Sequence, residues 1–423
     1  MQINSQRNRL RRIRAHSSSD SRLPGELPPI GSQKSQKSWR KTVQRSQKPP
    51  RGIYTAIIIL LICAVVMAVW VNRESLKPEN ISEWMQTEML GLGTGNGYPL
   101  HLSSENIMPR NFMSAGKNIF LTSDTAIEAY NGSAKQLFSK KHSFSDPVMN
   151  VSGNRVLVYN LGGTGYRLEN QLKTLVSDSA DGKLLGGAVC SNGRYALLTQ
   201  QDGYCGKLTV YLQNGQTAYE YSFSEYYPTA VALNDSGTQA AVTAVGTSGG
   251  EMVSVVYKLD FNSSSLVKPT ASYSDTVFLD VAYTDTGGIL AVGDKQTAAM
   301  DASGKALHAY HYDGGELSAW NLSSGMAVLG LSKFHNAANS SLTAINLNGN
   351  LIGSAQVDGT ISSVSRFGNK MAALSEGTVH AFTDAGQPAG SCSAGSNARA
   401  IALRSGNEAF VLEVSEIKLE KLE

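Results

Sequence analysis

A glycine-centred turn recurs eight times between residues 114 and 409, and this repeat restricts the fold more than any other feature. Each copy is an apolar segment, a turn of small residues that includes a glycine, and a second apolar segment. The repeat glycines stand at positions 116, 153, 193, 237, 287, 325, 368 and 406, with successive spacings of 37, 40, 44, 50, 38, 43 and 38 residues. A period of about 40 residues is typical of β-propellers, whose blades are four-stranded antiparallel sheets. The sequence therefore predicts an all-β fold, an eight-bladed β-propeller over residues 98–423, with seven blades as the alternative.

Each repeat continues with a third and a fourth strand, as in KLTVYLQNGQTAYEYSF and SLTAINLNGNLIGSAQV, where apolar segments flank an Asn-Gly turn. The eighth repeat lacks a segment for its outermost strand. Residues 98–104 precede the first inner strand and belong to no repeat. We expect this segment to supply the missing strand, because it would close the ring and remove two exposed sheet edges.

The composition is typical of a chain with many short strands and turns. The 41 Gly among 423 residues are about a tenth of the chain, above the ordinary ~7%. From Tyr98 onwards, short apolar runs alternate with turns rich in Gly, Asn, Asp and Ser. These properties exclude a small disulfide-rich peptide, a wholly disordered protein and a polytopic transporter, but they do not identify an activity.

Residues 53–71 form an apolar run without any charge, Gly or Pro. A helix of this length covers about 28 Å, close to the ~30 Å thickness of the bilayer core. Lys and Arg are concentrated before the run, which favours a cytoplasmic amino terminus and an extracytoplasmic propeller. The sequence thus predicts a disordered basic tail over 1–52, a signal anchor over 53–71 and a stalk over 72–97 with a short amphipathic helix near 81–90.

The formal net charge of +3 is the sum of two opposed regions. Residues 1–52 hold 13 Lys and Arg against 2 Asp and Glu, and the rest of the chain carries a net charge of −8. The tail is expected to act as a topology signal, with binding to anionic lipid headgroups as an alternative. We expect no specific nucleic-acid recognition, because no folded nucleic-acid module accompanies the basic residues.

The glycine-turn period and the strand–turn–strand units resemble the quinoprotein-like and WD40-like β-propeller superfamily over residues 98–423. The order of basic tail, single anchor, stalk helix, the sequence GNGYP and degenerate blades is similar to a family of unknown function made of single-pass, membrane-anchored propellers from Gram-positive bacteria. The Gly-His and Trp-Asp signatures of WD40 repeats are missing from this chain. The resemblance implies a propeller but no established activity.

The propeller region carries no recognisable catalytic motif. Quinone-dependent propellers, which this fold resembles, typically carry adjacent cysteines, a Ca²⁺ site and repeated Trp motifs, whereas here only Trp320 lies in the propeller region. His308 and His311 lie three residues apart on a predicted outer strand, so their side chains point to opposite faces. The sequence predicts no catalytic residue, no metal site and no cofactor.

The chain has four cysteines, one of them in the predicted span. Cys190, Cys205 and Cys392 belong to the propeller, and an odd number allows at most one disulfide there. Cys190 and Cys205 are predicted at opposite ends of one sheet, which argues against a bridge between them. We expect buried thiols.

Four charged residues stand out on the predicted innermost strands, which otherwise begin with small or apolar residues. They are Arg110, Asp146, Asp280 and Arg399. Similar positions in the repeat would bring them to one end of the axial channel, where they would line a pocket for a polar ligand. The alternative is that they are paired charges that fix the register of the blades, or solvated charges at the rim.

The most favoured function is a membrane-anchored, extracytoplasmic and non-catalytic scaffold for protein or cell-envelope contacts. The negative charge of the propeller region suits a basic or neutral partner. Two alternatives remain: an extracytoplasmic propeller enzyme, such as a metal-assisted hydrolase or an oxidoreductase, and a sensor that signals through the basic tail.

Overall fold

A computed structural model describes residues 58–63, 89, 93–102, 104, 106–263, 267–323, 325–333 and 336–423. The chain divides into two compact units, Met1–Val66 and Met67–Glu423, and every strand belongs to the second. Residues 58–63 are helical, while the predicted tail, the rest of the predicted span and nearly all of the predicted helix over 81–90 lie outside the described residues. Among the residues that are described, no helix is both long and apolar enough to cross a membrane.

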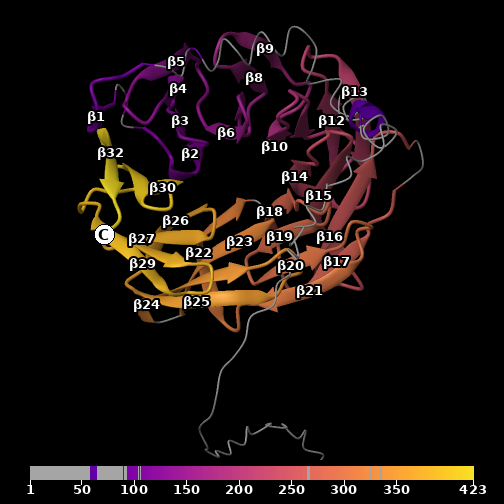
Figure 1. The fold of residues 1–423 in the computed structure, drawn as a ribbon. Coiled ribbons are helices and arrows are strands. Elements are labelled where there is room, and N and C mark those ends of the chain that lie inside the picture. Colours follow the sequence, from indigo (N-terminus) through magenta and orange to yellow (C-terminus); the bar gives the residue numbers. More distant parts are fainter. Residues whose placement is uncertain are drawn as a thin grey trace, which may run out of the picture. The chain divides into compact units, whose positions relative to one another are not determined.

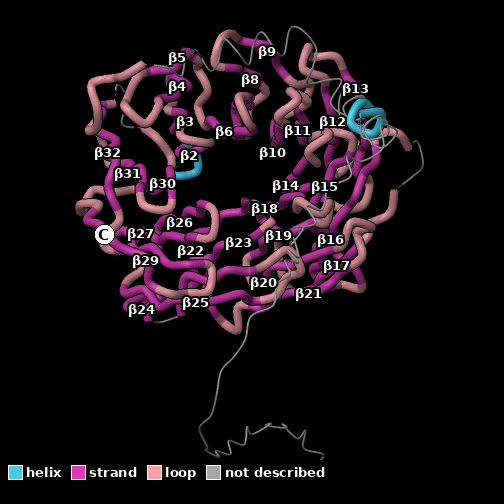
Figure 2. The backbone as a smooth tube through the Cα atoms, in the orientation of Figure 1, coloured by secondary structure: helices cyan, strands magenta, loops and turns pink. Residues whose placement is uncertain are grey.

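The second unit is a ring of eight four-stranded antiparallel sheets arranged around a central axis (Figure 1). Figure 2 shows that strands and their connecting loops make up almost all of this unit. The predicted eight-bladed propeller is therefore confirmed over the seven-bladed alternative.

The first four blades follow the chain from the innermost strand outwards. Blade 1 is β2 (Phe112–Ala115), β3 (Asn118–Thr122), β4 (Ala126–Tyr130) and β5 (Gln136–Lys141), preceded by the 3-10 helix η1 (Pro109–Asn111). Blade 2 is β6 (Pro147–Ser152), β7 (Arg155–Asn160), β8 (Gly165–Asn170) and β9 (Thr174–Ser179). Blade 3 is β10 (Leu184–Val189), β11 (Tyr195–Thr199), β12 (Gly206–Tyr211) and β13 (Thr217–Phe223). Blade 4 is β14 (Tyr227–Leu233), β15 (Gln239–Ser248), β16 (Glu251–Asp260) and β17 (Ala271–Ser274).

The last four blades repeat this order. Blade 5 is β18 (Phe278–Tyr283), β19 (Ile289–Gly293), β20 (Gln296–Met300) and β21 (Ala306–His311). Blade 6 is β22 (Gly315–Ser323), β23 (Met326–Lys333), β24 (Asn336–Ile345) and β25 (Leu351–Asp358). Blade 7 is β26 (Ile361–Phe367), β27 (Lys370–Ser375), β28 (Thr378–Thr383) and β29 (Pro388–Ser393). Blade 8 is β30 (Ala400–Ser405), β31 (Glu408–Leu412), β32 (Glu416–Lys421) and β1 (Leu100–His101).

Blade 8 is completed by the amino-terminal strand β1, as the sequence predicts. β1 pairs antiparallel with β32, with Leu100 opposite Ile417. The ring of Tyr98 packs 5.5 Å from that of Phe410, and its hydroxyl donates a hydrogen bond to the Asn131 carbonyl at 2.9 Å. The two ends of the ring are thus joined by strand pairing and by a shared core.

The hydrophobic core lies between neighbouring blades. In each blade the second strand has a buried stretch of at least four residues, and its side chains alternate towards the blade on either side. Between blades 1 and 2, for example, Phe120 packs with Met149 and Val158. A fully buried side chain of this kind stabilises the fold by about 1.5–3 kcal/mol, so adjacent blades support one another around the whole ring.

The repeat glycines form the turns between the first and second strands. Seven of the eight adopt positive φ, as Gly116 does at 61° and Gly153 at 59°, whereas Gly406 does not. Only glycine reaches this backbone region without steric cost, which explains why the repeat is visible in the sequence.

The even number of antiparallel strands gives the ring two distinct faces. Within a blade the four strands run alternately in opposite directions along the ring axis. The outermost strand therefore ends at the end of the ring where the innermost strand began, and the innermost strand of the next blade starts there too. We call this end the entry face; it carries the connections between blades and the turns between second and third strands. The opposite end, the exit face, carries the glycine turns and the turns between third and fourth strands.

Candidate functional site in the central channel

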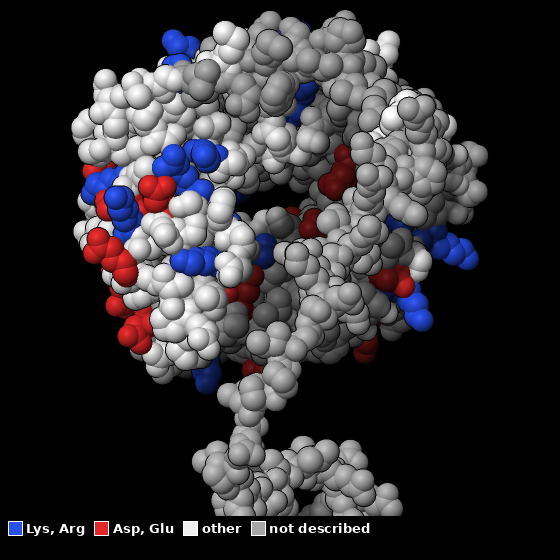
Figure 3. All heavy atoms as spheres, viewed as in Figure 1, with Lys and Arg blue, Asp and Glu red and all other residues white. Residues whose placement is uncertain are grey.

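The innermost strands line the axial channel and position the four predicted charges at two depths. Arg110 in η1, Asp146 before β6 and Arg399 before β30 lie at the entry face. Asp280 is the third residue of β18, one ladder step beyond Phe278, and so lies deeper in the channel. In the space-filling view a hollow opens in the ring, with acidic side chains among those on its wall (Figure 3).

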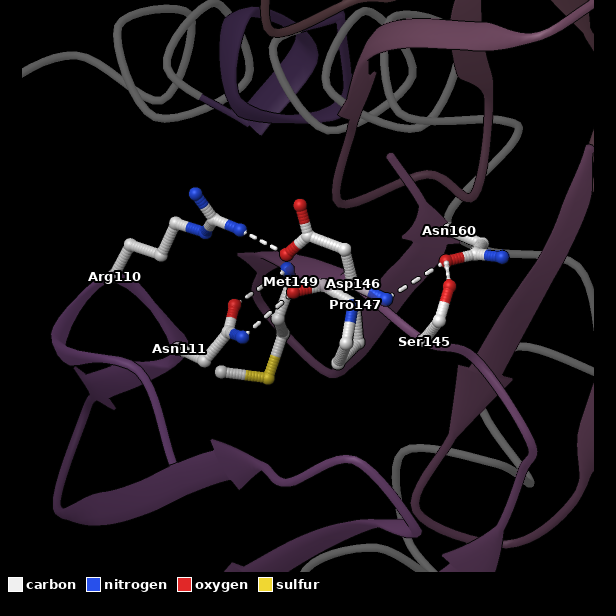
Figure 4. Close-up of polar contacts among 7 residues, drawn as sticks. All are labelled: Arg110, Asn111, Ser145, Asp146, Pro147, Met149 and Asn160. Carbon is white, nitrogen blue, oxygen red and sulfur yellow. Dashed lines mark hydrogen bonds and ion pairs between the residues drawn. The ribbon is translucent and has the colours of Figure 1, made fainter. Parts of the chain in front are cut away.

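Arg110 and Asp146 form an ion pair between blades 1 and 2, in which Arg110 Nη2 contacts Asp146 Oδ1 (Figure 4). Their side chains are 43% and 47% exposed, so the pair adds about 0–1 kcal/mol to stability. The second carboxylate oxygen of Asp146 and the other terminal nitrogen of Arg110 point away from β6. The pair thus leaves polar atoms available at the channel mouth.

The neighbouring Asn111 fixes the register of blade 1 against blade 2. Its Nδ2 donates to the Pro147 carbonyl at 2.7 Å, and its Oδ1 accepts from the Met149 N–H at 3.0 Å (Figure 4). The Asn111 side chain is buried. It donates to and accepts from the backbone of β6, as a residue of a neighbouring strand would. Asn111, which the sequence analysis did not single out, therefore carries more of the structural role than the exposed ion pair beside it.

Asp280 has a different environment from Asp146. Trp320 on β22 donates its Nε1–H to Asp280 Oδ2 at 3.0 Å, and the Val281 N–H donates to Oδ1 at 2.8 Å. Surrounding protein raises the pKa of the Asp280 carboxyl because burial disfavours the charged form, and these two hydrogen bonds act in the opposite direction. No basic side chain pairs with Asp280 in the part of the chain that the structure describes.

A β-bulge precedes the position of Asp280 in its strand. The inner strands of blades 3 to 7 share a register shift near their beginning. In blades 6 and 7 the bulged residue is a serine, and Ser318 and Ser362 donate to carbonyls of the second strand at 3.1 and 3.2 Å. In blade 5 the bulged residue is Leu279, whose side chain is 42% exposed. An apolar surface therefore adjoins the Asp280 carboxylate.

The pKa of the Tyr159 phenol is affected by charged residues of two other blades. Burial raises the pKa of its phenol to about 12, while Arg110 lowers that pKa and Asp280 raises it. The pKa of this phenol in blade 2 is thus affected by charges that blades 1 and 5 carry.

A glycine in blade 3 makes room for Tyr159. A Cβ at Gly187 would lie 3.0 Å from two ring carbons of Tyr159. Asn150 donates its Nδ2–H to the Gly187 carbonyl at 3.1 Å, beside the phenol. The sequence signal for this arrangement is the pair of glycines in LGGAV, which by itself indicates only a close approach of another group.

The four predicted residues are therefore only partly brought together. Arg110 and Asp146 form a pair, and Arg110 and Asp280 both influence Tyr159. Arg399 is exposed on blade 8 at the entry face, where its N–H donates to the Leu412 carbonyl at 2.8 Å. Sequence reasoning missed Tyr159 and counted Trp320 without assigning it a role.

The described cysteines form no disulfide. All four cysteines are unpaired, and Cys190 is buried with its pKa raised to about 12, chiefly by desolvation. In the described portion of the chain, no three His, Cys, Asp or Glu side chains are grouped so that they could hold a metal ion.

Comparisons with known proteins agree with the fold. A family model described as "family of unknown function (DUF5711)" matches residues 96–422. No curated protein matches the chain.

Several solved structures are similar in fold. The C-terminal WD40 domain of Sif2 is 12% identical with a TM-score of 0.52, and the match covers 77% of this chain and 100% of that one. Hydrazine synthase of Kuenenia stuttgartiensis is 12% identical, with a TM-score of 0.43 over 64% of this chain and 94% of that one. The Pan2 WD40 domain of Neurospora crassa is 10% identical, with a TM-score of 0.43 over 75% of this chain and 88% of that one. At these identities the likeness to Sif2 concerns the propeller fold alone.

Proposed function

Given that the chain belongs to the DUF5711 family of unknown function, we propose that it is a membrane-anchored, non-catalytic interaction scaffold that binds a basic protein partner at its entry face. The proposal includes an anchor over residues 53–71, a cytoplasmic amino terminus and an extracytoplasmic ring in the envelope of a Gram-positive bacterium. The observation that carries it is the opposed placement of the amino-terminal connection and the acidic loops on the two faces.

The amino-terminal segment joins the ring at the exit face. Gly95 donates its N–H to Ser133 Oγ at 3.0 Å, and Gly97 donates to the Ser133 carbonyl at 3.1 Å. Asn131 Nδ2 donates to the Gly93 carbonyl at 3.1 Å. Residues 131–135 join the third and fourth strands of blade 1, so they belong to the exit face. An anchor that precedes Gly93 is thus connected to the ring through this face.

The loops of the entry face are acidic. Their described carboxylates are Asp124, Asp146, Asp181, Asp202, Glu225, Asp275, Asp294, Asp313, Glu376 and Glu413, against the bases Arg110, Lys183, Lys295 and Arg399. The exit-face loops carry Lys117, Lys135, Lys173, Arg194, Lys268 and Lys305 against Asp235, Asp285, Asp301 and Asp384. The negative charge of the propeller region is therefore concentrated on the face opposite the amino-terminal connection.

This distribution favours a basic partner. A face with an excess of one charge attracts a complementary surface and speeds encounter, and it repels surfaces of like charge. Asp202, Glu225 and Asp313 are exposed, and none of them forms an ion pair within the described residues. They are available to a partner that approaches from the side away from the exit face.

The test is photo-crosslinking in cells with p-benzoylphenylalanine in the full-length chain. The amino acid replaces Ser224, an exposed residue of the entry face, or Asn348, an exposed residue of the exit face, as the matched control. We expect a recurrent protein with a basic surface to be crosslinked from position 224 and not from position 348.

Charge reversal then tests the electrostatics. Changing Asp202, Glu225 and Asp313 together to Lys should reduce the crosslinking yield at least fivefold, whereas the exit-face changes Asp235→Lys and Asp301→Lys should leave it within twofold. The proposal is wrong if the partner is captured only from the exit face, or if the entry-face reversal has no effect.

A further inference from the structure

The Asp280 carboxylate lacks a counter-ion within the described chain. Both of its hydrogen-bond donors, the indole of Trp320 and the N–H of Val281, are neutral. Two other acids of the ring with little exposure have arginine partners: Glu169 with Arg167 at 2.8 Å and Asp384 with Arg366 at 3.2 Å. Asp280 is half-buried, and a carboxylate that has lost part of its contact with water is stabilised by a nearby cation.

Aromatic and apolar surface lies beside this carboxylate. Trp320, on the innermost strand of blade 6, keeps 37% of its surface exposed while its Nε1–H is bound to Asp280. Leu279 is exposed next to Asp280 because the bulge of β18 turns it out of the blade core. An indole and a carboxylate side by side are the groups that bind alkylammonium and guanidinium ions, through charge-assisted hydrogen bonds and cation–π contact.

The charges nearest the channel mouth do not pair with Asp280. Arg110 is paired with Asp146, and Arg399 lies exposed on blade 8 at the entry face. The site therefore offers a carboxylate that forms no ion pair within the described residues, together with an aromatic ring and an apolar side chain.

We propose that the channel binds an organic cation, a primary ammonium or guanidinium group on an alkyl chain, with its charge on Asp280 and its chain against Trp320 and Leu279. The cation is either a free amine or the side chain of a lysine or arginine on a partner. This site is separate from the exposed acidic loops and does not require a protein partner to be present.

The experiment uses the full-length chain in detergent micelles, with Trp39, Trp70 and Trp84 changed to Phe. Trp320 is then the only one of the four tryptophans left, and its fluorescence reports on the site directly. We titrate n-butylammonium and n-butylguanidinium, with n-butanol as the neutral control. We expect a saturable change with both cations and none with n-butanol.

Variants identify the groups that bind. Asp280→Asn should weaken n-butylammonium binding at least tenfold, whereas Asp313→Asn, which removes an exposed carboxylate of the entry face, should change it less than twofold. Blades 6 and 7 carry a serine at the position of this bulge. We therefore expect the Leu279→Ser variant to fold. It should weaken n-butylammonium binding about threefold and leave methylammonium binding unchanged.

N-acetyl-lysine methylamide, a lysine capped at both ends, distinguishes a free amine from the lysine side chain of a partner. If N-acetyl-lysine methylamide binds at least tenfold more tightly than n-butylammonium, the site takes a side chain of a partner; similar affinities indicate a free amine. The proposal is overturned if neither cation gives a saturable signal, if the D280N variant, folded by circular dichroism, binds as the parent does, or if D313N weakens binding equally.

Discussion

At the scale of single residues, Asp146 and Asp280 show how position decides the chemistry of identical side chains. Asp146 lies at the channel mouth, half exposed, and pairs with an arginine from the preceding blade. Asp280 lies deeper and accepts hydrogen bonds from two neutral donors, one of them from the following blade. Asp146 is neutralised by its arginine partner. Burial disfavours the charged form of Asp280, at a cost to stability, and no base is paired with it among the described residues.

The cost of Asp280 predicts a pH-dependent difference between the wild type and D280N. Because burial raises the pKa of Asp280 in the folded chain, the unfolded state releases this proton first as the pH rises. The wild type keeps full stability below the ordinary pKa of an aspartate and loses part of it as the pH rises towards the raised value. We therefore expect the melting temperature of D280N, relative to wild type, to increase between pH 4 and pH 7.

Thermal unfolding of the full-length chain followed by circular dichroism measures this difference. The D313N variant, which alters an exposed carboxylate, serves as the control and should show no such trend. A relative stability of D280N that is constant or falls over this pH range would contradict the assignment of Asp280 as a half-buried acid that destabilises the fold when charged.

At the scale of elements, the ring depends on the short strand β1 and the segment before it. β1 has only two residues, so backbone pairing with β32 is a small part of the closure. The side chains of Tyr98, Leu100 and Leu102 pack against the core shared by blades 8 and 1. Closure is thus achieved mostly by apolar contacts, with the strand fixing their register.

Tyr98→Ala is expected to destabilise the full-length chain by about 2–3 kcal/mol, somewhat below the 3–5 kcal/mol of a fully buried aromatic residue. The change removes the contact with Phe410 and the hydrogen bond to the Asn131 carbonyl. Tyr98→Phe keeps the ring and should cost about 1 kcal/mol, the value of the hydrogen bond. Tyr204→Ala, at an exposed turn, is the control and should have an effect within about 0.5 kcal/mol. Equal effects of Tyr98→Ala and Tyr204→Ala in denaturant unfolding would show that this segment does not hold the ring closed.

At the scale of the whole molecule, the two faces of the ring differ in charge and in connection. The amino-terminal segment joins the exit face, and the acidic loops occupy the entry face. The faces are distinct because each blade has an even number of strands, so every inner strand begins at the same end. The charge of each face depends on the residues in its loops. The acidic loops and the amino-terminal connection therefore lie on opposite faces of the ring.

The proposed topology predicts which cysteines an impermeant reagent reaches. In a chain whose four cysteines are changed to Ala, single cysteines are introduced as Ser17→Cys in the tail and Ser224→Cys in the ring. A membrane-impermeant maleimide should label the second position in intact cells and the first only after permeabilisation. Labelling of the tail in intact cells, or of neither position before permeabilisation, would contradict an extracytoplasmic ring.

The sequence by itself determined the number of blades and the way the ring closes. A tight turn with positive φ favours glycine, as at Gly116 and Gly153. The repeat can therefore be recognised from short stretches of the sequence. The missing outer strand of the last blade and the leftover segment 98–104 likewise predicted the pairing of β1 with β32. These features depend on short stretches of chain and on the rule that sheet edges must be covered.

Only the tertiary structure decided which charges meet and which do not. Arg110 contacts Asp146 36 residues away, and Asp280 contacts Trp320 40 residues away, because the ring packs each blade against the next. The approach of Tyr159 to the channel further depends on the absence of a side chain at Gly187 in another blade. A sequence pattern records the period of the blades, but the partner of a side chain across a blade interface is set by the twist and register of two separate sheets.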